Sequence, residues 1–141
     1  MKIKIFCIAF SIVFLSFKTN AGQVKIFVSN IVDEKGTIHY GVYNDEDNFL
    51  NEEGKIIGGF KKVIDVKKNG LLIENLEESN YAIAIYHDKN SNKKFDKFLA
   101  IPVEMYGFSN NAKVFLGPPK FSDAAFFLGK EDLVELKIEL K

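Results

Sequence analysis

Residues 81–127 of this chain read YAIAIYHDKNSNKKFDKFLAIPVEMYGFSNNAKVFLGPPKFSDAAFF. They begin with an alternating apolar run, continue into a loop rich in Asp and Asn, and end in a long aromatic segment. Alternation with a period of two is typical of a β-strand that buries one face. The stretch therefore predicts a strand, a polar loop at its end and a long connection that packs on the protein.

The rest of the chain repeats the strand pattern. Including that strand, at residues 80–87, turn signals separate predicted strands at residues 24–28, 38–42, 60–66, 70–76 and 134–140. We expect the first two to form a hairpin, and we find no convincing amphipathic helix. The pattern favours an all-β fold, an antiparallel β-sandwich of the immunoglobulin-like or prealbumin-like kind, with about seven strands and one long ordered loop. A partly closed barrel is the alternative.

The N-terminus has the features of an export signal. Lys2 and Lys4 precede an apolar run from Ile5 to Phe17, and small residues follow up to Ala21. The run is too short to span a bilayer comfortably. We therefore predict a signal peptide over residues 1–21, a single β-sandwich domain over residues 22–141, and a periplasmic or secreted protein without a transmembrane segment in its mature chain. An uncleaved membrane anchor is the alternative.

Composition restricts the partners of the mature chain. Residues 1–21 hold three of the 19 basic residues and the only cysteine, so 16 lysines face 19 acidic residues, a net charge of −3. The chain has no arginine for bidentate phosphate contacts, and we expect no nucleic-acid partner. Without cysteine, the exported domain must be stabilised by its core or by a bound ion rather than by disulfides.

Two long connections interrupt the strand pattern. Residues 44–59 are acidic and glycine-punctuated, and we expect a solvated loop with a short helical turn, a second cation site being the alternative. Residues 97–120 are too long for a plain linker in a compact domain. The second connection and its end carry nine large apolar residues, which predicts that it packs across an open end of the sandwich: Phe98, Leu99, Ile101, Met105, Tyr106, Phe108, Phe115, Leu116 and Phe121.

Two motifs carry a family resemblance. Gly107–Ala112 read GFSNNA and Gly117–Phe126 read GPPKFSDAAF, after a strand that ends in His-Asp and an Asn-rich loop that Asp closes. Over essentially the whole mature chain this pattern resembles the bacterial exported family called domain of unknown function 2141. Ala100 stands where that pattern more usually has glycine. The resemblance implies a small secreted or periplasmic β-sandwich of unassigned function.

The Asn-rich loop is the one candidate metal site. Oxygen-bearing groups recur at positions 1, 3, 5, 7 and 9 of a calcium-type loop, supplied by Asp88, Asn90, Asn92, the Lys94 carbonyl and Asp96. Lys93 and Leu99 replace the usual Gly and Glu at positions 6 and 12, so we predict weak calcium binding, with a Kd of ~10⁻⁴ to 10⁻³ M. The alternative is a stack of Asx turns, in which these side chains accept local backbone N–H groups and no ion is needed.

Catalytic motifs are missing from the sequence. It has no cysteine nucleophile in the mature chain, no Gly-x-Ser-x-Gly turn and no phosphate-binding glycine loop, and Ser109 fits a turn better than a nucleophile elbow. We expect a non-catalytic module that is structural or envelope-associated, with its aromatic residues buried. The alternative is a module that binds a glycan or a partner protein through Tyr86, Tyr106 and Phe108, which would then be exposed.

Overall fold

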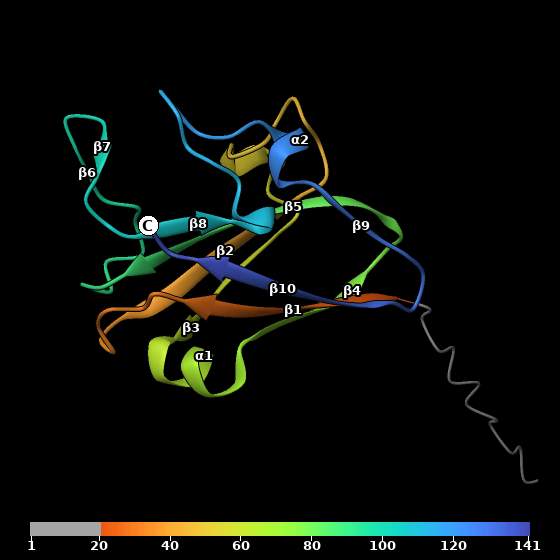
Figure 1. Ribbon diagram of the computed structural model, residues 1–141, viewed down its shortest axis with the longest axis horizontal. Helices are drawn as coiled ribbons and strands as arrows, with labels where there is room; N and C mark the ends of the chain where they lie inside the picture. Colours follow the sequence, from red (N-terminus) through yellow and green to blue (C-terminus); the bar gives the residue numbers. More distant parts are fainter. Residues whose placement is uncertain (1–20) are drawn as a thin grey trace, which may run out of the picture.

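The computed structural model describes residues 21–141, which form two main β-sheets and one small two-stranded sheet (Figure 1). The first sheet has the strand order β10-β1-β4, with β1 at Gly22–Ser29, β4 at Leu71–Leu76 and β10 at Leu133–Glu139. The second has the order β3-β2-β5-β8 with β9 also on β5, and comprises β2 at Thr37–Tyr43, β3 at Ile57–Lys62, β5 at Ser79–Asp88, β8 at Tyr106–Phe108 and β9 at Phe126–Leu128. The predicted β-sandwich is confirmed, and residues 1–20 of the predicted signal lie outside the described residues.

Short elements connect the strands of the two sheets. A small hairpin consists of β6 at Lys97–Phe98 and β7 at Ile101–Pro102. Two helices and two 3₁₀ turns complete the fold, with α1 at Val63–Asn69, α2 at Phe121–Ala124, η1 at Glu52–Gly54 and η2 at Ser109–Asn111. Figure 1 shows α1 on one side of the sandwich and the β6–β7 hairpin and α2 on the opposite side.

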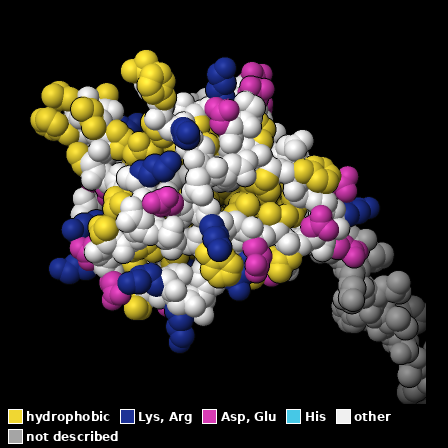
Figure 2. All heavy atoms as spheres, in the orientation of Figure 1, with side chains coloured by type: hydrophobic (Ala, Val, Ile, Leu, Met, Phe, Trp, Pro, Cys, Tyr) yellow, Lys and Arg dark blue, Asp and Glu magenta, His cyan; other side chains and the backbone are white. Residues whose placement is uncertain are grey.

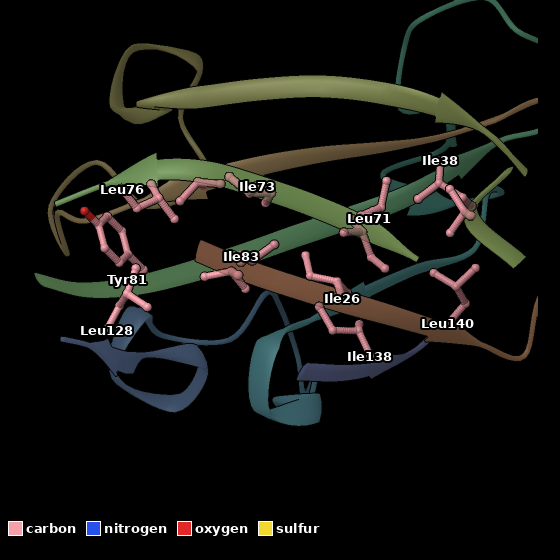
Figure 3. Packing of buried hydrophobic residues seen from close by; sticks show 14 of the residues in the cluster. Ile26, Ile38, Leu71, Ile73, Leu76, Tyr81, Ile83, Leu128, Ile138 and Leu140 are labelled. Atoms are coloured by element: carbon pink, nitrogen blue, oxygen red, sulfur yellow. The ribbon is translucent and has the colours of Figure 1, made fainter. Parts of the chain in front are cut away.

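The core lies between the two sheets. Ile26 and Ile138 of the first sheet and Ile38 and Ile83 of the second point into it, because alternate side chains of each strand face inward (Figure 3). Burying one such side chain stabilises the fold by about 1.5 to 3 kcal/mol. Among the described residues, this core lies within residues 24–140, so a chain that begins at Gly22 contains both sheets and these contacts between them.

The predicted hairpin between the first two strands is wrong. β1 pairs in parallel with β10 and antiparallel with β4, whereas β2 pairs with β3 and β5. Residues 30–36 therefore cross from one sheet to the other. Both strands carry an apolar face, and placing them in opposite sheets lets these two faces bury one another.

A helix replaces the end of another predicted strand. Residues 60–62 belong to β3 as expected, but α1 begins at Val63, and the expectation that the domain lacks a helix is wrong. Val63 and Val66 are both buried, a spacing of three that fits one face of a helix. Gly70 ends the helix with a φ of +70°, which glycine adopts without strain.

The prediction that residues 97–120 pack across the sandwich is wrong for about half of their apolar residues. Phe108 is buried, and Met105, Tyr106 and Phe121 are partly buried. The other large apolar side chains of this segment are exposed: Phe98, Leu99, Ile101, Phe115 and Leu116. In the hairpin the reason is that β6 and β7 are two residues long and pair only with each other, so no second layer covers their side chains.

A candidate ligand groove on the five-stranded sheet

Four aromatic side chains form a row across the outer face of the second sheet. The strand register places Phe60 of β3 opposite His39 of β2, His39 opposite Tyr86 of β5, and Tyr86 opposite Tyr106 of β8. The His39 ring lies 5.1 Å from the Phe60 ring and 4.7 Å from the Tyr86 ring, at interplanar angles of 22° and 20°. The rings thus stack in the direction that crosses the strands, and their edges face the neighbouring row of residues.

The neighbouring row consists of small residues. Gly58, Gly41 and Ala84 are paired across β3, β2 and β5, and Phe108 of β8 ends the row. Tyr43 and Lys55 cover the two glycines, since a Cβ at Gly41 would lie 3.0 Å from Tyr43 Oη and a Cβ at Gly58 would lie 2.7 Å from Lys55 Cδ. Together with Ala84, these residues form the floor of a groove beside the aromatic row. The resulting groove has a volume of about 1030 Å³, within the range of small-molecule sites.

Tyr43 and Phe108 line the far side of the groove, and Phe95 lines one end. Phe49, outside the lining, contacts the Tyr43 ring edge-on at 5.3 Å and the Phe108 ring at 6.4 Å. At the loop end, the Phe95 ring lies 5.3 Å from the ring of Tyr86 and 5.7 Å from that of Tyr106. The walls are therefore rigid, since each ring is held by at least one other.

Lysines dominate the charged lining of the groove. Four lysines and one glutamate line it, namely Lys55, Lys93, Lys94, Lys97 and Glu52. Lys55 Nζ lies 2.6 Å from Glu52 Oε2, which neutralises one lysine. Lys93 Nζ lies 5.6 Å from the centre of the Phe60 ring, and Lys97 Nζ lies 5.3 Å from that of Phe95. The groove therefore carries an excess of positive charge above aromatic rings.

The phenol of Tyr86 stays protonated in this setting. Burial raises its pKa to about 12, and the nearby carboxylates of Asp88 and Glu104 add to the shift. A protonated phenol can donate a hydrogen bond as well as accept one. Tyr86 therefore offers a neutral polar group in the aromatic row.

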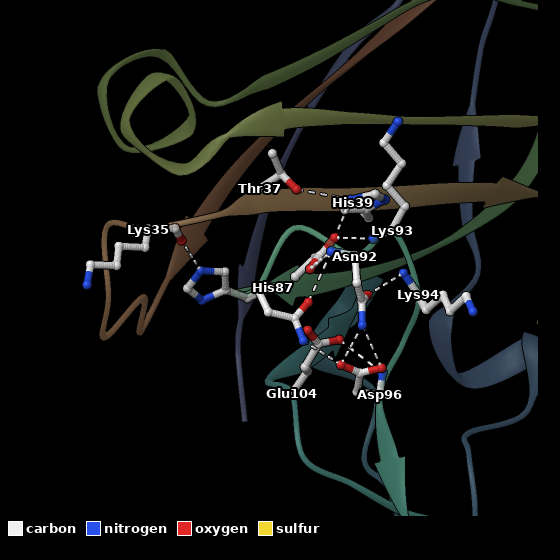
Figure 4. A network of polar contacts seen from close by, with 11 residues as sticks. Lys35, Thr37, His39, His87, Asn92, Lys93, Lys94, Asp96 and Glu104 are labelled. Atoms are coloured by element: carbon white, nitrogen blue, oxygen red, sulfur yellow. Dashed lines mark hydrogen bonds and ion pairs between the residues drawn. The ribbon is translucent and has the colours of Figure 1, made fainter.

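Asp88 anchors the loop at residues 88–96. Figure 4 shows the polar network of this loop, with His39, Asn92, Lys93 and Asp96. The side chain of Asp88 is fully buried; Oδ1 accepts the backbone N–H of Asn92 at 3.1 Å and Oδ2 accepts that of Lys93 at 2.7 Å. His39 Nε2 lies 3.2 Å from Oδ2 and also 3.0 Å from Thr37 Oγ1. Burial lowers the pKa of His39, against the opposing attraction of Asp88, so this contact is a hydrogen bond from a neutral ring.

The other predicted calcium ligands meet in the same loop, but they bond to one another. Asp96 accepts the side-chain amides of Asn90 at 2.8 Å and of Asn92 at 2.8 and 3.0 Å, and these bonds lower its pKa. Lys94 joins through its backbone N–H, which donates to Asn92 Oδ1 at 2.8 Å. No group of three or more Asp, Glu, His or Cys side chains in residues 21–141 is arranged to hold a metal ion. The loop has the hydrogen bonds of the Asx-turn alternative, and calcium binding stays a prediction.

Glu104 belongs to this loop cluster, and the sequence analysis missed it. Its Oε2 accepts the backbone N–H of Asp96 at 3.1 Å, while its Oε1 is buried without a hydrogen-bond partner among the described residues. Burial raises the pKa of Glu104, and the charges of Asp88 and Asp96 add to the shift. No sequence signal marks this residue, because it lies outside the loop and reaches it only through the fold.

The GFSNNA motif is a structural clamp. Ser109 is buried, donates to the Ala124 carbonyl at 2.5 Å and accepts the Ile83 N–H at 2.9 Å. Asn110 and Asn111 have φ angles of 58° and 50°, as a tight turn requires. Their side chains bond to the backbone of the segment after α2 and of β10. The motif ties β5, β8, α2 and β10 together, and the buried hydroxyl does not face the groove.

Of the three aromatic residues considered for binding, some fit the expectation of burial and others fit the expectation of an accessible binding surface. Tyr86 and Tyr106 are partly buried and line the groove. Phe108 is 8% exposed and packs in a second apolar cluster on this face of the sheet. The expectation of full burial therefore holds only for Phe108.

Comparison of the chain with solved structures and with curated proteins gives no information about its activity. Three structures of a pilus-presented adhesin are similar to the chain, with TM-scores of 0.30 to 0.31 and identities of 13 to 14%. The chain is matched over 86 to 87% of its length and covers 26 to 27% of the adhesin. A likeness this weak implies nothing about activity, and a search of curated proteins finds no match.

Two further findings concern membrane-spanning helices and the protein family. No helix within residues 21–141 is long and apolar enough to cross a membrane. The profile of a family described as uncharacterized proteins conserved in bacteria matches residues 26–135, which include every strand from β2 to β9 and half of β1. By this match, the chain belongs to the family known as domain of unknown function 2141.

Proposed function

We propose that the protein is an exported, non-catalytic binding module that takes an acidic oligosaccharide into the groove of its second sheet. The observation that carries the proposal is the groove above Gly58, Gly41 and Ala84, which lies between the aromatic row and the side chains of Tyr43 and Phe108 and has lysines in its lining. The export signal predicted from residues 1–21 would place the groove where envelope or extracellular glycans are present.

The charge of the groove supports an anionic ligand. Three of its lysines have no acidic partner in the groove lining, because Glu52 pairs with Lys55. The edges of aromatic rings carry partial positive charge, and these edges face the row of small residues. Carboxylates spaced along a ligand would therefore meet ammonium groups and ring edges together.

The shape and polarity of the groove support a sugar. Pyranose rings have apolar C–H faces and a periphery of hydroxyl groups, and the groove offers aromatic walls together with the Tyr86 hydroxyl. A volume of about 1030 Å³ accommodates several sugar rings. The groove crosses the strands from β3 to β8, so it suits an elongated ligand.

The acidic residues near the groove support binding without hydrolysis. Glycoside hydrolysis normally needs two carboxyl groups on either side of the scissile bond. Among the described residues, Glu52 is the only acidic side chain in the lining, and Asp88 is buried against His39 and backbone N–H groups.

The proposal is tested by titrating the ¹⁵N-labelled chain from Gly22 onward with oligogalacturonate and, as matched control, with its methyl ester. We expect the acid to shift the amide signals of Gly41, Gly58 and Ala84, and the neutral ester to bind at least about tenfold more weakly, because each desolvated charge contact contributes more than 1 kcal/mol. Ala84→Leu fills the hollow and should abolish the shifts. Glu135→Leu adds an apolar side chain of the same size at an exposed position of β10 and should leave them unchanged.

Two results would contradict the proposal. Equal affinity for the acid and the ester would exclude recognition of charge by the lysines. Unchanged binding by Ala84→Leu would place any sugar site outside the groove.

A further inference from the structure

Two loop tips beside the groove expose large apolar side chains (Figure 2). The first is the β6–β7 hairpin with Phe98, Leu99 and Ile101, and the second is the loop before α2 with Phe115 and Leu116. These five side chains are between 67% and 96% exposed. Both tips belong to the same side of the molecule, because residues 100–102 and residues 114, 117 and 118 line the same groove.

The backbone at both tips is in a conformation that leucine disfavours. Leu99 and Ala100, the two turn residues of the hairpin, have φ angles of 48° and 66°, and Leu116 has a φ of 54°. A two-residue hairpin turn with two positive φ angles ordinarily takes Asn-Gly, and a non-glycine residue in this region costs roughly 1 to 2 kcal/mol. Leu99 is 82% exposed and Leu116 is 96% exposed, so neither gains burial in return within the described fold. Such local strain without compensation in the fold is characteristic of functional loops.

The chain segment that carries the tips differs in charge from the rest of the chain. Residues 93–120 contain five lysines, Lys93, Lys94, Lys97, Lys113 and Lys120, and two acidic residues, Asp96 and Glu104, a net charge of +3. Residues 22–141 as a whole carry −3, so the remainder carries −6. Both acidic residues are engaged in the hydrogen bonds of the loop at residues 88–96.

We propose that the two tips dock the protein on an anionic lipid surface, with the leucine and phenylalanine side chains inserted among the lipids and the lysines against the headgroups. Projecting tips suit this occupant because a bilayer surface admits convex apolar groups, whereas a protein partner would need a complementary hollow. Apolar insertion and lysine attraction are the two contributions that together give stable peripheral binding. The inference does not depend on the ligand of the groove.

The test is sedimentation of the chain from Gly22 onward with vesicles. Wild type should bind vesicles of phosphatidylcholine with about 30 mol% phosphatidylglycerol, bind pure phosphatidylcholine several-fold more weakly, and be released by about 0.5 M salt, which screens the lysines. The variant Leu99→Asn/Leu116→Asn should partition at least about tenfold more weakly, since two leucines no longer enter the lipid. Its melting temperature should equal or exceed that of wild type, because asparagine tolerates a positive φ better than leucine.

Matched variants test each contribution separately. Val32 is 74% exposed in the β1–β2 connection, and Val32→Asn should bind vesicles like wild type. Lys97→Gln/Lys113→Gln should weaken binding about fivefold per lysine, whereas Lys68→Gln/Lys130→Gln should have little effect.

Three outcomes would overturn the inference. The first is that the wild-type chain does not bind the anionic vesicles. The second is that Val32→Asn loses as much vesicle binding as the double leucine variant. The third is that wild type binds neutral and anionic vesicles equally.

Discussion

The buried hydroxyl of Ser109 connects three segments that are distant in the sequence. Its oxygen accepts from β5 and its hydrogen is donated to the end of α2, while the residue itself follows β8. A hydroxyl is well suited to this position because it is the smallest side-chain group that both donates and accepts. An alanine there would leave an N–H and a carbonyl buried without partners.

Ser109→Ala should therefore destabilise the protein by about 2 kcal/mol or more, since each buried unsatisfied group costs about 1 to 3 kcal/mol. The measurement is urea unfolding followed by circular dichroism. Ser122→Ala, at an exposed position of α2, is the control and should change stability by less than about 0.5 kcal/mol. Equal effects of the two substitutions would show that the clamp contributes nothing.

The lowered pKa of His39 predicts acid sensitivity near neutral pH. Between its ordinary value of 6.5 and its lowered folded-state pKa, the unfolded chain binds a proton that the folded protein does not. The stability contributed by neutral His39 is thus complete above pH 6.5 and is lost as the pH falls through the lowered value. Wild type should lose unfolding free energy as the pH falls below about 6.5, and His39→Gln should lose less.

Glu104 changes stability with pH in the opposite direction to His39, so the two contributions must be separated. Because its pKa is raised above 4.5, its contribution to stability is present below that pH and is lost as the pH rises through the raised value. Wild type and His39→Gln both contain Glu104. The difference between their profiles of unfolding free energy against pH therefore isolates the contribution of His39. Parallel profiles for wild type and His39→Gln would contradict the assignment to His39.

At the scale of elements, the segment from β6 to α2 contains both anchored and exposed parts. Phe108 is held between Phe49 and Tyr106, at ring distances of 6.4 and 5.9 Å, whereas Phe115 is 83% exposed. The anchored part is thus β8 with η2, because these are the parts that pair with β5 and bond to β10.

Truncating the two phenylalanines should therefore have unequal effects. Phe108→Ala should cost ~3 kcal/mol or more, the range for deleting a buried aromatic side chain. Phe115→Ala should change the free energy of unfolding by less than about 0.5 kcal/mol. Denaturant titration of both variants measures the difference, and a large cost for Phe115→Ala would mean that its loop packs on the protein in solution.

The loop from Asp88 to Asp96 is an element with two predicted states. In the hydrogen-bonded state, Asn90 and Asn92 present their amide N–H groups to Asp96. Calcium would need their oxygens instead, and a rotation of each side-chain amide would supply them. The ion would therefore replace hydrogen bonds that the loop already makes.

The calcium prediction is tested by thermal melting. With a Kd of ~10⁻⁴ to 10⁻³ M, about 2 mM calcium should stabilise the fold by roughly 0.6 to 1.8 kcal/mol and raise the melting temperature by very roughly 2 to 8 °C. Asp96→Asn should remove this increase. Identical curves for wild type in calcium and in chelator would contradict calcium binding and leave the Asx-turn loop.

At the scale of the whole molecule, the sandwich has no disulfide and depends on its core. The only cysteine of the chain is Cys7, within the predicted signal. Both sheets contribute large, fully buried apolar side chains to the core between them. This design is compatible with an oxidising compartment, because no thiol is exposed to it.

Processing of the chain is the whole-molecule prediction. We expect the exported protein to begin at Gly22 and to contain no thiol, because the apolar run and the small residues before Gly22 fit a cleaved signal. Intact-mass measurement of the protein from the envelope or the medium checks this. A species that retains residues 1–21 would contradict cleavage and favour an anchored protein.

The sequence alone determined most of the strands and the fold class. Alternation with a period of two is a local property, so β4, β5 and β10 were predicted close to their observed bounds. The turn at Asn110 and Asn111 and the Asx bonds of the 88–96 loop follow from equally local chemistry. The GFSNNA and GPPKFSDAAF motifs also indicated the family correctly.

Only the tertiary structure decided which strands pair and which side chains meet. Pairing of β1 with β10 joins residues more than 100 positions apart, and its energy comes from burying two apolar faces together. The same register aligns Phe60, His39, Tyr86 and Tyr106 beside a row of small residues, and no local pattern marks that alignment. The exposed leucines of the loop tips were missed for a related reason, because hydrophobicity predicts burial only where a second layer is present to cover the side chain.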